Sequence, residues 1–216
     1  MVTLTWSPPY SPTSLAATML DSAESGEQSA VETGDFELMQ RAGQGDERAF
    51  TVLVERHHRA VIGTITRMLG DETEAHDLAQ LTFLRVWHAA PRYQPSAKFT
   101  TWLFTIVRNL VFNESRRRST AKLGSLEVSN PDDAPYEHAT SEPSPTTQLQ
   151  ASELEQAIQD AIQALPEQQR LAVVLRRYEE LSYEEIAKVL SVTVPSVKSL
   201  LFRARTELRE ALKGWL

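Results

Sequence analysis

Basic and hydroxyl side chains cluster near the C-terminus of this 216-residue sequence. Between residues 195 and 213 there are five basic residues and two acidic ones, a local charge of +3. Lysine and arginine suit DNA phosphates or guanine edges, and hydroxyl groups suit phosphate oxygens. If these side chains share one exposed helix face, they could contact DNA. The set consists of Ser196, Lys198, Ser199, Arg203 and Arg205.

The surrounding residues predict the helix-turn-helix that would present this set. Ser182 and Glu185 have the spacing of a capping box, so a helix is expected to begin at Ser182. A tight turn at 191–193 follows, and a second helix begins near Pro195, which suits a first helical turn. In a helix-turn-helix that second helix lies in the DNA major groove. The alternative is a basic amphipathic helix in an ordinary bundle.

The turn departs from the usual pattern at one position. Residue 191 is serine, whereas a helix-turn-helix often has glycine there. If the turn requires a left-handed conformation, serine costs about 1 kcal/mol.

A second basic stretch, residues 92–118, mixes cations with aromatic side chains. It has six basic residues and one glutamate, a local charge of +5. Unpaired bases stack on aromatic rings while cations neutralise the backbone, so this mixture suits single-stranded nucleic acid. We expect the triplet at 116–118 to contact phosphates, the alternative being a solvated helix end. Trp102 is expected to be a core residue.

Apolar residues recur at helical spacing within residues 35–118 and 153–216, and no alternating pattern typical of a strand is present there. The predicted fold class is therefore all-α, with two small helical domains joined by a flexible linker. The linker would span ~100 Å if fully extended. The expected segments are a disordered acidic extension (1–34), a helical domain (35–118), a flexible acidic linker (119–152) and a four-helix domain with the helix-turn-helix (153–216).

The net charge of −7 would by itself argue against a nucleic-acid binder. The extension and the linker carry −4 each, so the two helical domains are close to neutral overall.

The sequence has no cysteine, which excludes disulfides and thiolate catalysis and fits a reducing compartment. No stretch approaches the ~18 apolar residues of a membrane helix, and residues 1–34 lack the basic start of a signal peptide.

Catalysis, a metal site and a cofactor are not expected. His57 and His58 are adjacent, so they point to different sides of a helix, and no second ligand pair with metal-binding spacing accompanies them. The sequence has neither a glycine-rich phosphate loop nor a serine elbow.

Three stretches of the sequence resemble bacterial sigma factors of the extracytoplasmic-function group. They occur in the family's order and fall in both helical domains. They are 77–87 (DLAQLTFLRVW), 99–118 (FTTWLFTIVRNL and the arginine triplet) and 165–205, from LPEQQR to FRAR.

The resemblance implies a promoter-specificity subunit, not an enzyme, that binds core RNA polymerase and promoter DNA as duplex and as melted strand. Holding a flipped base would offset part of the cost of opening the duplex, a few kcal/mol per base. Leu81 replaces a carboxylate that the family usually has, and Leu200 replaces an arginine of many relatives.

The resemblance also implies a site for each partner. The polymerase-docking face would consist of Asp77, Gln80, Phe83 and Trp87. The minus-10 site would consist of Lys98, Phe99, Arg108, Asn109, Arg116, Arg117 and Arg118. The minus-35 site would consist of Ser196, Lys198, Ser199, Phe202, Arg203 and Arg205.

An anti-sigma protein as inhibitor and a cytoplasmic location follow from the same resemblance. The first alternative is a stand-alone regulator that binds DNA as a dimer, with the N-terminal helices as a sensing domain. A helical adaptor is the second, and it predicts no salt-sensitive DNA binding. Residues 77–87 and 92–118 favour the sigma factor, because a stand-alone regulator needs neither stretch.

Overall fold

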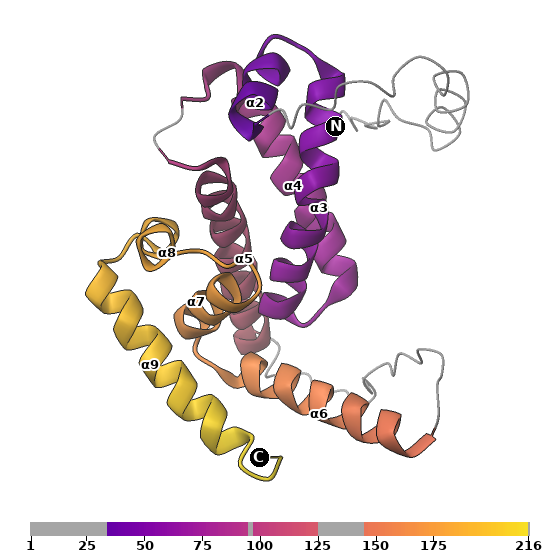
Figure 1. Ribbon diagram of the computed structural model, residues 1–216, viewed down its shortest axis with the longest axis vertical. Helices are drawn as coiled ribbons and strands as arrows, with labels where there is room; N and C mark the ends of the chain where they lie inside the picture. The colour runs from indigo at the N-terminus through magenta and orange to yellow at the C-terminus, as the bar shows by residue number, and fades with distance from the viewer. Residues whose placement is uncertain (1–33, 95–96, 125–144, 216) are drawn as a thin grey trace. The chain divides into compact units, whose positions relative to one another are not determined.

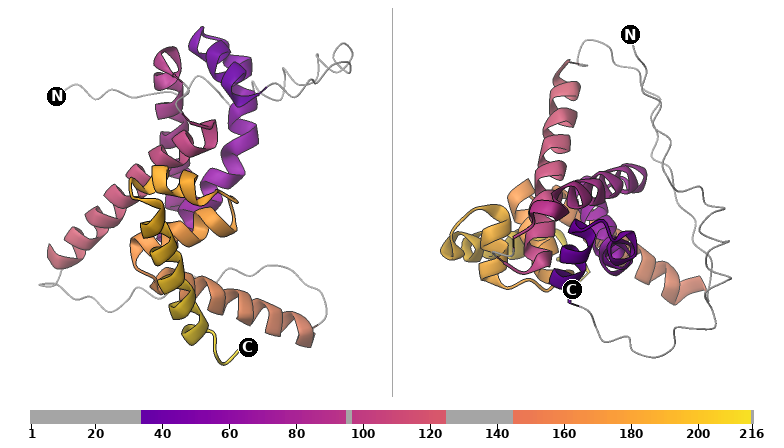
Figure 2. Two further views of the ribbon diagram at one scale, coloured as in Figure 1. Left: turned by 60° about the vertical axis from the view of Figure 1, so that its left-hand side comes forward. Right: turned by 90° about the horizontal axis from the view of Figure 1, so that it is seen from above.

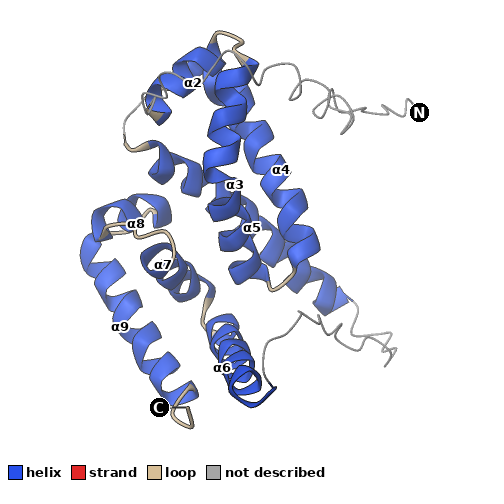
Figure 3. Cartoon of the chain, turned by 45° about the vertical axis from the view of Figure 1, so that its right-hand side comes forward, coloured by secondary structure: helices blue, strands red, loops and turns tan. Residues whose placement is uncertain are grey.

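The computed structural model describes residues 34–94, 97–124 and 145–215, and every regular element in these ranges is helical (Figure 3), which confirms the predicted all-α class. No helix in these ranges is long and apolar enough to cross a membrane. In chain order the elements are α2 (Asp35–Gly43), α3 (Glu47–Leu69), α4 (Glu72–Ala89), the 3-10 helix η1 (Ala90–Arg92), α5 (Phe99–Gly124), α6 (Pro145–Ala164), α7 (Glu167–Arg177), α8 (Tyr183–Leu190) and α9 (Val194–Ala211).

Helices α2 to α5 form an N-terminal block whose turns are set by short-range signals. The Asp46 carboxylate accepts a hydrogen bond from the Ala49 amide at 3.1 Å and caps the start of α3. Gly70 ends α3 with a φ of 72°, which glycine adopts without steric cost. The Asp71 carboxylate then caps α4 through the Glu74 amide at 3.0 Å. With only two residues between them, α3 and α4 pack against each other.

Helices α6 to α9 form a C-terminal block that contains the predicted helix-turn-helix. Both bonds of the capping box at the start of α8 are present: the Ser182 hydroxyl accepts from the Glu185 amide, and the Glu185 carboxylate accepts from the Ser182 amide at 2.7 Å. A three-residue turn leads to α9, whose first turn contains Pro195 and is capped by Thr193. The sequence prediction of two capped helices and a tight turn is therefore confirmed in this block.

The turn between α8 and α9 holds a serine in a conformation that favours glycine. Ser191 has a φ of 58° and a ψ of 44°, in the left-handed region. Its amide donates to the Lys188 carbonyl, and the Val192 amide donates to the Ala187 carbonyl at 2.9 Å. These two bonds are the Schellman pattern, in which this residue is usually glycine. The turn does require the left-handed conformation, so serine at this position costs about 1 kcal/mol relative to glycine.

Replacing Ser191 with glycine is expected to raise the free energy of unfolding by about 0.5–1 kcal/mol, because glycine adopts the left-handed region without a Cβ clash. Chemical denaturation followed by circular dichroism measures the change. Ser199→Gly is the matched control, because Ser199 lies in the interior of α9 and the same substitution there is expected to lower stability by about 0.5 kcal/mol. Loss of stability in both variants would contradict the argument.

The described parts of the two blocks pack against each other and belong to one compact unit. Helix α7 contacts α3, and α8 contacts α5, as Figures 1 and 2 show. One cluster of buried apolar residues runs through both blocks and includes Ile65 and Val107 of the first and Leu175 and Ile186 of the second. The sequence predicted two domains but no packing between them.

The last carbonyls of α3 bind donors from distant parts of the chain. Gln163 Nε2 donates to the Arg67 carbonyl at 2.7 Å, and Arg170 Nη1 donates to the Met68 carbonyl. Arg118 Nη1 of α5 donates to the Leu69 carbonyl at 3.1 Å. The end of α3, which lacks intrahelical donors, is thus completed by α5 and by the junction of α6 and α7.

The predicted linker, 119–152, is wrong at both ends. Helix α5 continues to Gly124 and α6 begins at Pro145, so 20 residues separate the two helices. Good helix formers such as Ala121 and Lys122 lengthen α5 although the surrounding composition is polar. The middle of the predicted linker, and the predicted extension apart from Gly34, lie outside the described residues.

Candidate nucleic-acid interface

All six predicted minus-35 residues lie on α9, and all are exposed. The opposite face of α9 is buried through Val197, Leu201 and Ala204, which expose at most 5% of their surface. This apolar face holds the helix against the block, so the polar face must point outward. Leu200 is half-buried and packs against the core, so it adds little to the outer face.

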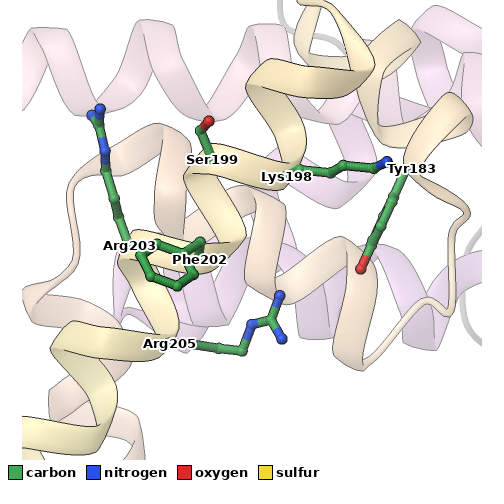
Figure 4. A pocket seen from close by; sticks show the side chains of 6 residues that line it. All are labelled: Tyr183, Lys198, Ser199, Phe202, Arg203 and Arg205. Atoms are coloured by element: carbon green, nitrogen blue, oxygen red, sulfur yellow. The ribbon is translucent and has the colours of Figure 1, made fainter.

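A pocket of about 620 Å³ lies on the outer side of α9. Figure 4 shows Lys198 extending toward Tyr183 of α8, while Arg203 points away from it. Phe202 is 69% exposed, the largest value among the exposed large apolar residues of the described chain. An aromatic ring beside guanidinium and ammonium groups can contact thymine methyl groups and guanine edges in a major groove. The pocket is lined by Tyr183, Lys198, Ser199, Phe202, Arg203 and Arg205.

Two predicted minus-10 residues, Lys98 and Arg108, contact the helix-turn-helix. Lys98 Nζ lies 2.9 Å from Glu185 Oε1, and this ammonium together with the Ser182 amide holds the pKa of Glu185 below its usual value. Arg108 Nη1 donates to the Leu190 carbonyl at 3.3 Å. Asn109 is exposed, and its side-chain oxygen accepts from Arg108 at 2.8 Å. Lys98 and Arg108 therefore lie at the contact between the two blocks.

Phe99, another predicted minus-10 residue, is buried with an exposed fraction of 5%. Its ring packs against Trp102 and Tyr93, with ring centroids 5.8 and 6.3 Å away. The expectation that Trp102 belongs to the core fits its half-buried place in this aromatic cluster. Little of the Phe99 surface is therefore free to meet DNA, and its ring contributes to the aromatic cluster with Tyr93 and Trp102.

A buried histidine lies beneath the same cluster. The His57 ring is 5.1 Å from the Phe99 ring, and its Nε2 lies 3.0 Å from an Asp35 oxygen. Burial alone would raise the pKa of Asp35, but His57 and Arg56 outweigh it and hold the pKa below its ordinary value of 3.8. The burial of His57, with 8% of its surface exposed, fits a structural role.

The arginine triplet of the predicted minus-10 site divides into two groups. Arg117 makes three hydrogen bonds to the Glu114 carboxylate, at 2.6, 2.8 and 3.0 Å. Arg118 pairs with Glu74 and also binds the end of α3. Arg116 is exposed and has no ion pair in the described part of the chain, so it is the cation of the triplet that is available for a phosphate. The carboxylates that neutralise the other two come partly from α4, which local sequence did not indicate.

The predicted polymerase-docking residues lie on α4, but they do not share one exposed face. Asp77 and Gln80 are exposed, whereas Phe83 is only 7% exposed and Trp87 packs on Phe50 with ring centroids 4.9 Å apart. The exposed apolar side chains of α4 are Leu81 and Leu84, at 36% and 43%. They stand opposite the buried stripe Ala75, Ala79, Thr82 and Val86, so the helical period could have indicated them.

A half-buried carboxylate, Glu179, lies where α3 faces the residues after α7. Thr64 Oγ1 donates to Glu179 Oε1 at 2.9 Å. Burial raises the pKa of Glu179 above its ordinary 4.5, and this effect exceeds the opposing effects of Thr64, Arg67 and His57. The folded state favours the protonated form of Glu179. The contribution of this group to stability is therefore fully present below its pKa in the unfolded chain, and it is lost as pH rises through its higher pKa in the folded protein.

The free energy of unfolding of the parent protein is therefore expected to fall as pH rises from about 4.5 toward 7. Glu179→Gln is expected to abolish this fall. The amide oxygen of glutamine still accepts from Thr64, so the variant should match the parent near pH 4 and exceed it at pH 7. Denaturant unfolding across this range measures the difference. Glu180→Gln is the control, since that side chain is exposed. Parallel curves for the parent and Glu179→Gln would contradict the assignment.

Two known families match the blocks just described. The family described as Sigma-70 region 2 matches residues 53–120, and the one described as Sigma-70, region 4 matches residues 155–208. The RNA polymerase sigma-H factor of Pseudomonas aeruginosa is 36% identical over 185 residues, 84% of this chain and 95% of the relative. The ECF RNA polymerase sigma-E factor of Escherichia coli K12 is 31% identical over 175 residues, 79% and 90% of the two chains.

Solved structures agree with these matches. CnrH, determined in complex with the cytosolic domain of CnrY, has a TM-score of 0.62 at 26% identity and covers 84% of this chain and 99% of its own. The sigma factor RpoE of Bartonella quintana, in complex with the anti-sigma factor NepR, has a TM-score of 0.61 at 25% identity, with 76% and 96% covered. The resemblance drawn from the sequence is confirmed: the chain belongs to the sigma-70 family of RNA polymerase sigma factors, in its extracytoplasmic-function (ECF) group.

Proposed function

We propose that this protein is a promoter-specificity subunit, which binds core RNA polymerase, recognises minus-35 and minus-10 elements and promotes DNA melting. The observation that carries the proposal is the outer face of α9. Six side chains selected from the sequence all lie exposed on that helix, which follows a complete capping box and turn. Duplex DNA would be read there by Arg203 and Lys198 at base edges or phosphates, and by Phe202 through apolar contact.

The N-terminal block supplies the second half of the proposal. Lys98, Asn109, Arg116 and Arg117 are the exposed polar groups of the predicted minus-10 site, and the aromatic cluster of Tyr93, Phe99 and Trp102 lies beside Lys98 in the chain. Binding an unstacked base there would favour the melted strand over the duplex. A protein that binds the open state better than the closed one shifts the equilibrium without nucleotide hydrolysis. This role requires binding and no catalytic group.

Reading two separate elements requires that the blocks reach both. The 20 residues between α5 and α6 can span at most ~70 Å, less than the ~100 Å expected from the sequence. One turn of DNA measures ~34 Å, so the shorter connection still suffices for elements more than one turn apart.

Partners follow from the same proposal. Core polymerase would dock on α4, where Asp77, Gln80, Leu81 and Leu84 are exposed. An anti-sigma protein is proposed as the inhibitor, since the RpoE neighbour was solved in complex with one. We place this activity in the cytoplasm, with the polymerase.

Reconstituted transcription tests the proposal. Purified protein is added to core polymerase on a library of genomic fragments, and transcript start sites are sequenced. The expected result is a discrete set of starts that depend on the protein and share two spaced elements. A protein that neither co-purifies with core nor directs any start would contradict the proposal. Binding to duplex DNA as a dimer without polymerase would instead favour the stand-alone regulator.

A further inference from the structure

Two exposed histidines from neighbouring helices lie close together on the N-terminal block. His58 of α3 and His76 of α4 have ring centroids 6.4 Å apart. We propose that these two imidazoles form a binding site for a late transition-metal ion, Cu²⁺, Ni²⁺ or Zn²⁺. The inference goes beyond the proposed function, because neither histidine is assigned to the binding of DNA or polymerase.

The separation of the two rings suits one ion between them. An imidazole nitrogen binds Zn²⁺ at ~2.0–2.1 Å, so each ring centroid would lie ~3.2 Å from the ion. Two such rings are ~5.2 Å apart at a tetrahedral angle and ~6.4 Å apart on opposite sides of the ion. The observed 6.4 Å lies at the upper end of this range. Because both side chains are exposed, rotation about their own bonds can aim a nitrogen at the ion without moving either helix.

The scaffold beneath the pair is already in place. Helices α3 and α4 lie side by side and are joined by a two-residue turn (Figure 1). The His58 ring stacks on the ring of Phe83 of α4, with centroids 6.3 Å apart and 27° between the planes. Phe83 is only 7% exposed, so this contact holds His58 on the side of α3 that faces α4. A ligand pair carried by packed helices loses little conformational freedom when the ion binds.

The nitrogens of both rings are available as ligands. In the part of the chain that the structure describes, neither His58 nor His76 makes a hydrogen bond or an ion pair. His57, in contrast, is buried, and its Nε2 lies 3.0 Å from an Asp35 oxygen. The partner of His58 therefore comes from another helix, which spacing in the sequence did not indicate. Imidazole suits copper, nickel and zinc ions, whereas Mg²⁺ and Ca²⁺ prefer oxygen ligands.

Carboxylates flank the pair on both helices. Glu55 precedes His58 by three positions and Glu72 precedes His76 by four, spacings at which residues are neighbours on a helix surface. Both carboxylates are exposed, and their negative charge favours a cation at the pair. Within the described residues no group of three or more potential ligands gathers around one point, so water is expected to fill the remaining positions. Affinity is expected to be highest for Cu²⁺.

Copper binding to the full-length protein, with any purification tag removed, tests the site. Titration calorimetry measures the affinity, and pulsed electron paramagnetic resonance counts the imidazole ligands of the bound Cu²⁺. The parent is expected to hold the ion through two imidazoles. His76→Asn removes one exposed ring without disturbing the stack on Phe83, and it is expected to weaken binding by about tenfold or more, since even the loss of a group that only supports a ligand has that effect.

His88→Asn is the matched control, because His88 is also exposed on α4 and contacts no other histidine ring among the described residues. It is expected to match the parent. The inference would be overturned by no saturable binding at millimolar Cu²⁺, by a complex with a single imidazole, or by equal affinities of the parent and His76→Asn. An equal loss of affinity in both variants would also overturn it.

None of these measurements needs polymerase or DNA. A chain that binds the ion through two imidazoles, yet directs no transcript with core polymerase, would contradict the proposed function and not the metal site.

Discussion

Replacing Arg203 with alanine is expected to weaken binding to a duplex minus-35 element by about tenfold to a hundredfold, while binding to core RNA polymerase stays unchanged. Arg203 is exposed on the outer face of α9, lines the pocket there and has no hydrogen bond or ion pair in the described part of the chain. Its guanidinium is therefore free to make a bidentate contact with a guanine edge, and alanine supplies no substitute. Fluorescence anisotropy with a promoter found in the transcription assay measures the loss.

Arg209→Ala is the matched control for this substitution. Arg209 is also an exposed cation of α9, but it lies in the last turn, away from the pocket. Removing this charge is expected to weaken DNA binding by about threefold or less. Because the charge attracts phosphates whatever the bases, the loss of affinity should be equal on any DNA sequence. If Arg203→Ala lost polymerase binding to the same extent as DNA binding, a folding defect would be the explanation and the base-contact role would be wrong.

Replacing Arg170 with alanine is expected to lower the free energy of unfolding by about 3 kcal/mol. The half-buried guanidinium donates to the carbonyls of Met68, Gln163 and Leu165. These bonds join α6, α7 and the end of α3, and removing the donors leaves partly buried carbonyls without partners. Burial lowers the pKa of Arg170, but the group stays charged at any pH at which the protein folds.

Urea denaturation followed by circular dichroism measures this loss. Arg177→Ala is the control, since Arg177 lies on the same helix, is exposed and has no partner in the ranges that the structure describes. It is expected to change stability by less than about 0.5 kcal/mol. Similar losses in both variants would mean that helix propensity, and not the contact with α3, accounts for the effect.

Much of the fold could be predicted because its signals are local. The capping box at Ser182 and Glu185, the aspartate cap at Asp46 and the glycine stop at Gly70 each act within one turn of the chain. The outward face of α9 could also be predicted, because its apolar residues recur at helical spacing and fix which side is buried.

What the sequence did not reveal depends on contacts between distant segments. Nothing local to Arg118 shows that Glu74 of another helix neutralises it, and nothing local to Lys98 shows that Glu185 lies beside it. Phe83 was assigned to the docking face from the resemblance, yet its position on α4 turns it toward the core. Its neighbour Leu84 carries the exposed apolar surface instead.

The capping of α3 by later segments also has a consequence for synthesis of the chain. The donors at Gln163 and Arg170 lie 96 and 102 residues after the carbonyls that they bind. At ~5–20 residues per second, the ribosome adds these donors roughly 5–20 s after it has made the end of α3. During that interval the Arg67 and Met68 carbonyls at the end of α3 lack these donors, and the apolar face that α7 later covers is exposed. A nascent chain of this protein therefore reaches its full stability only after α7, with Arg170, has been synthesised.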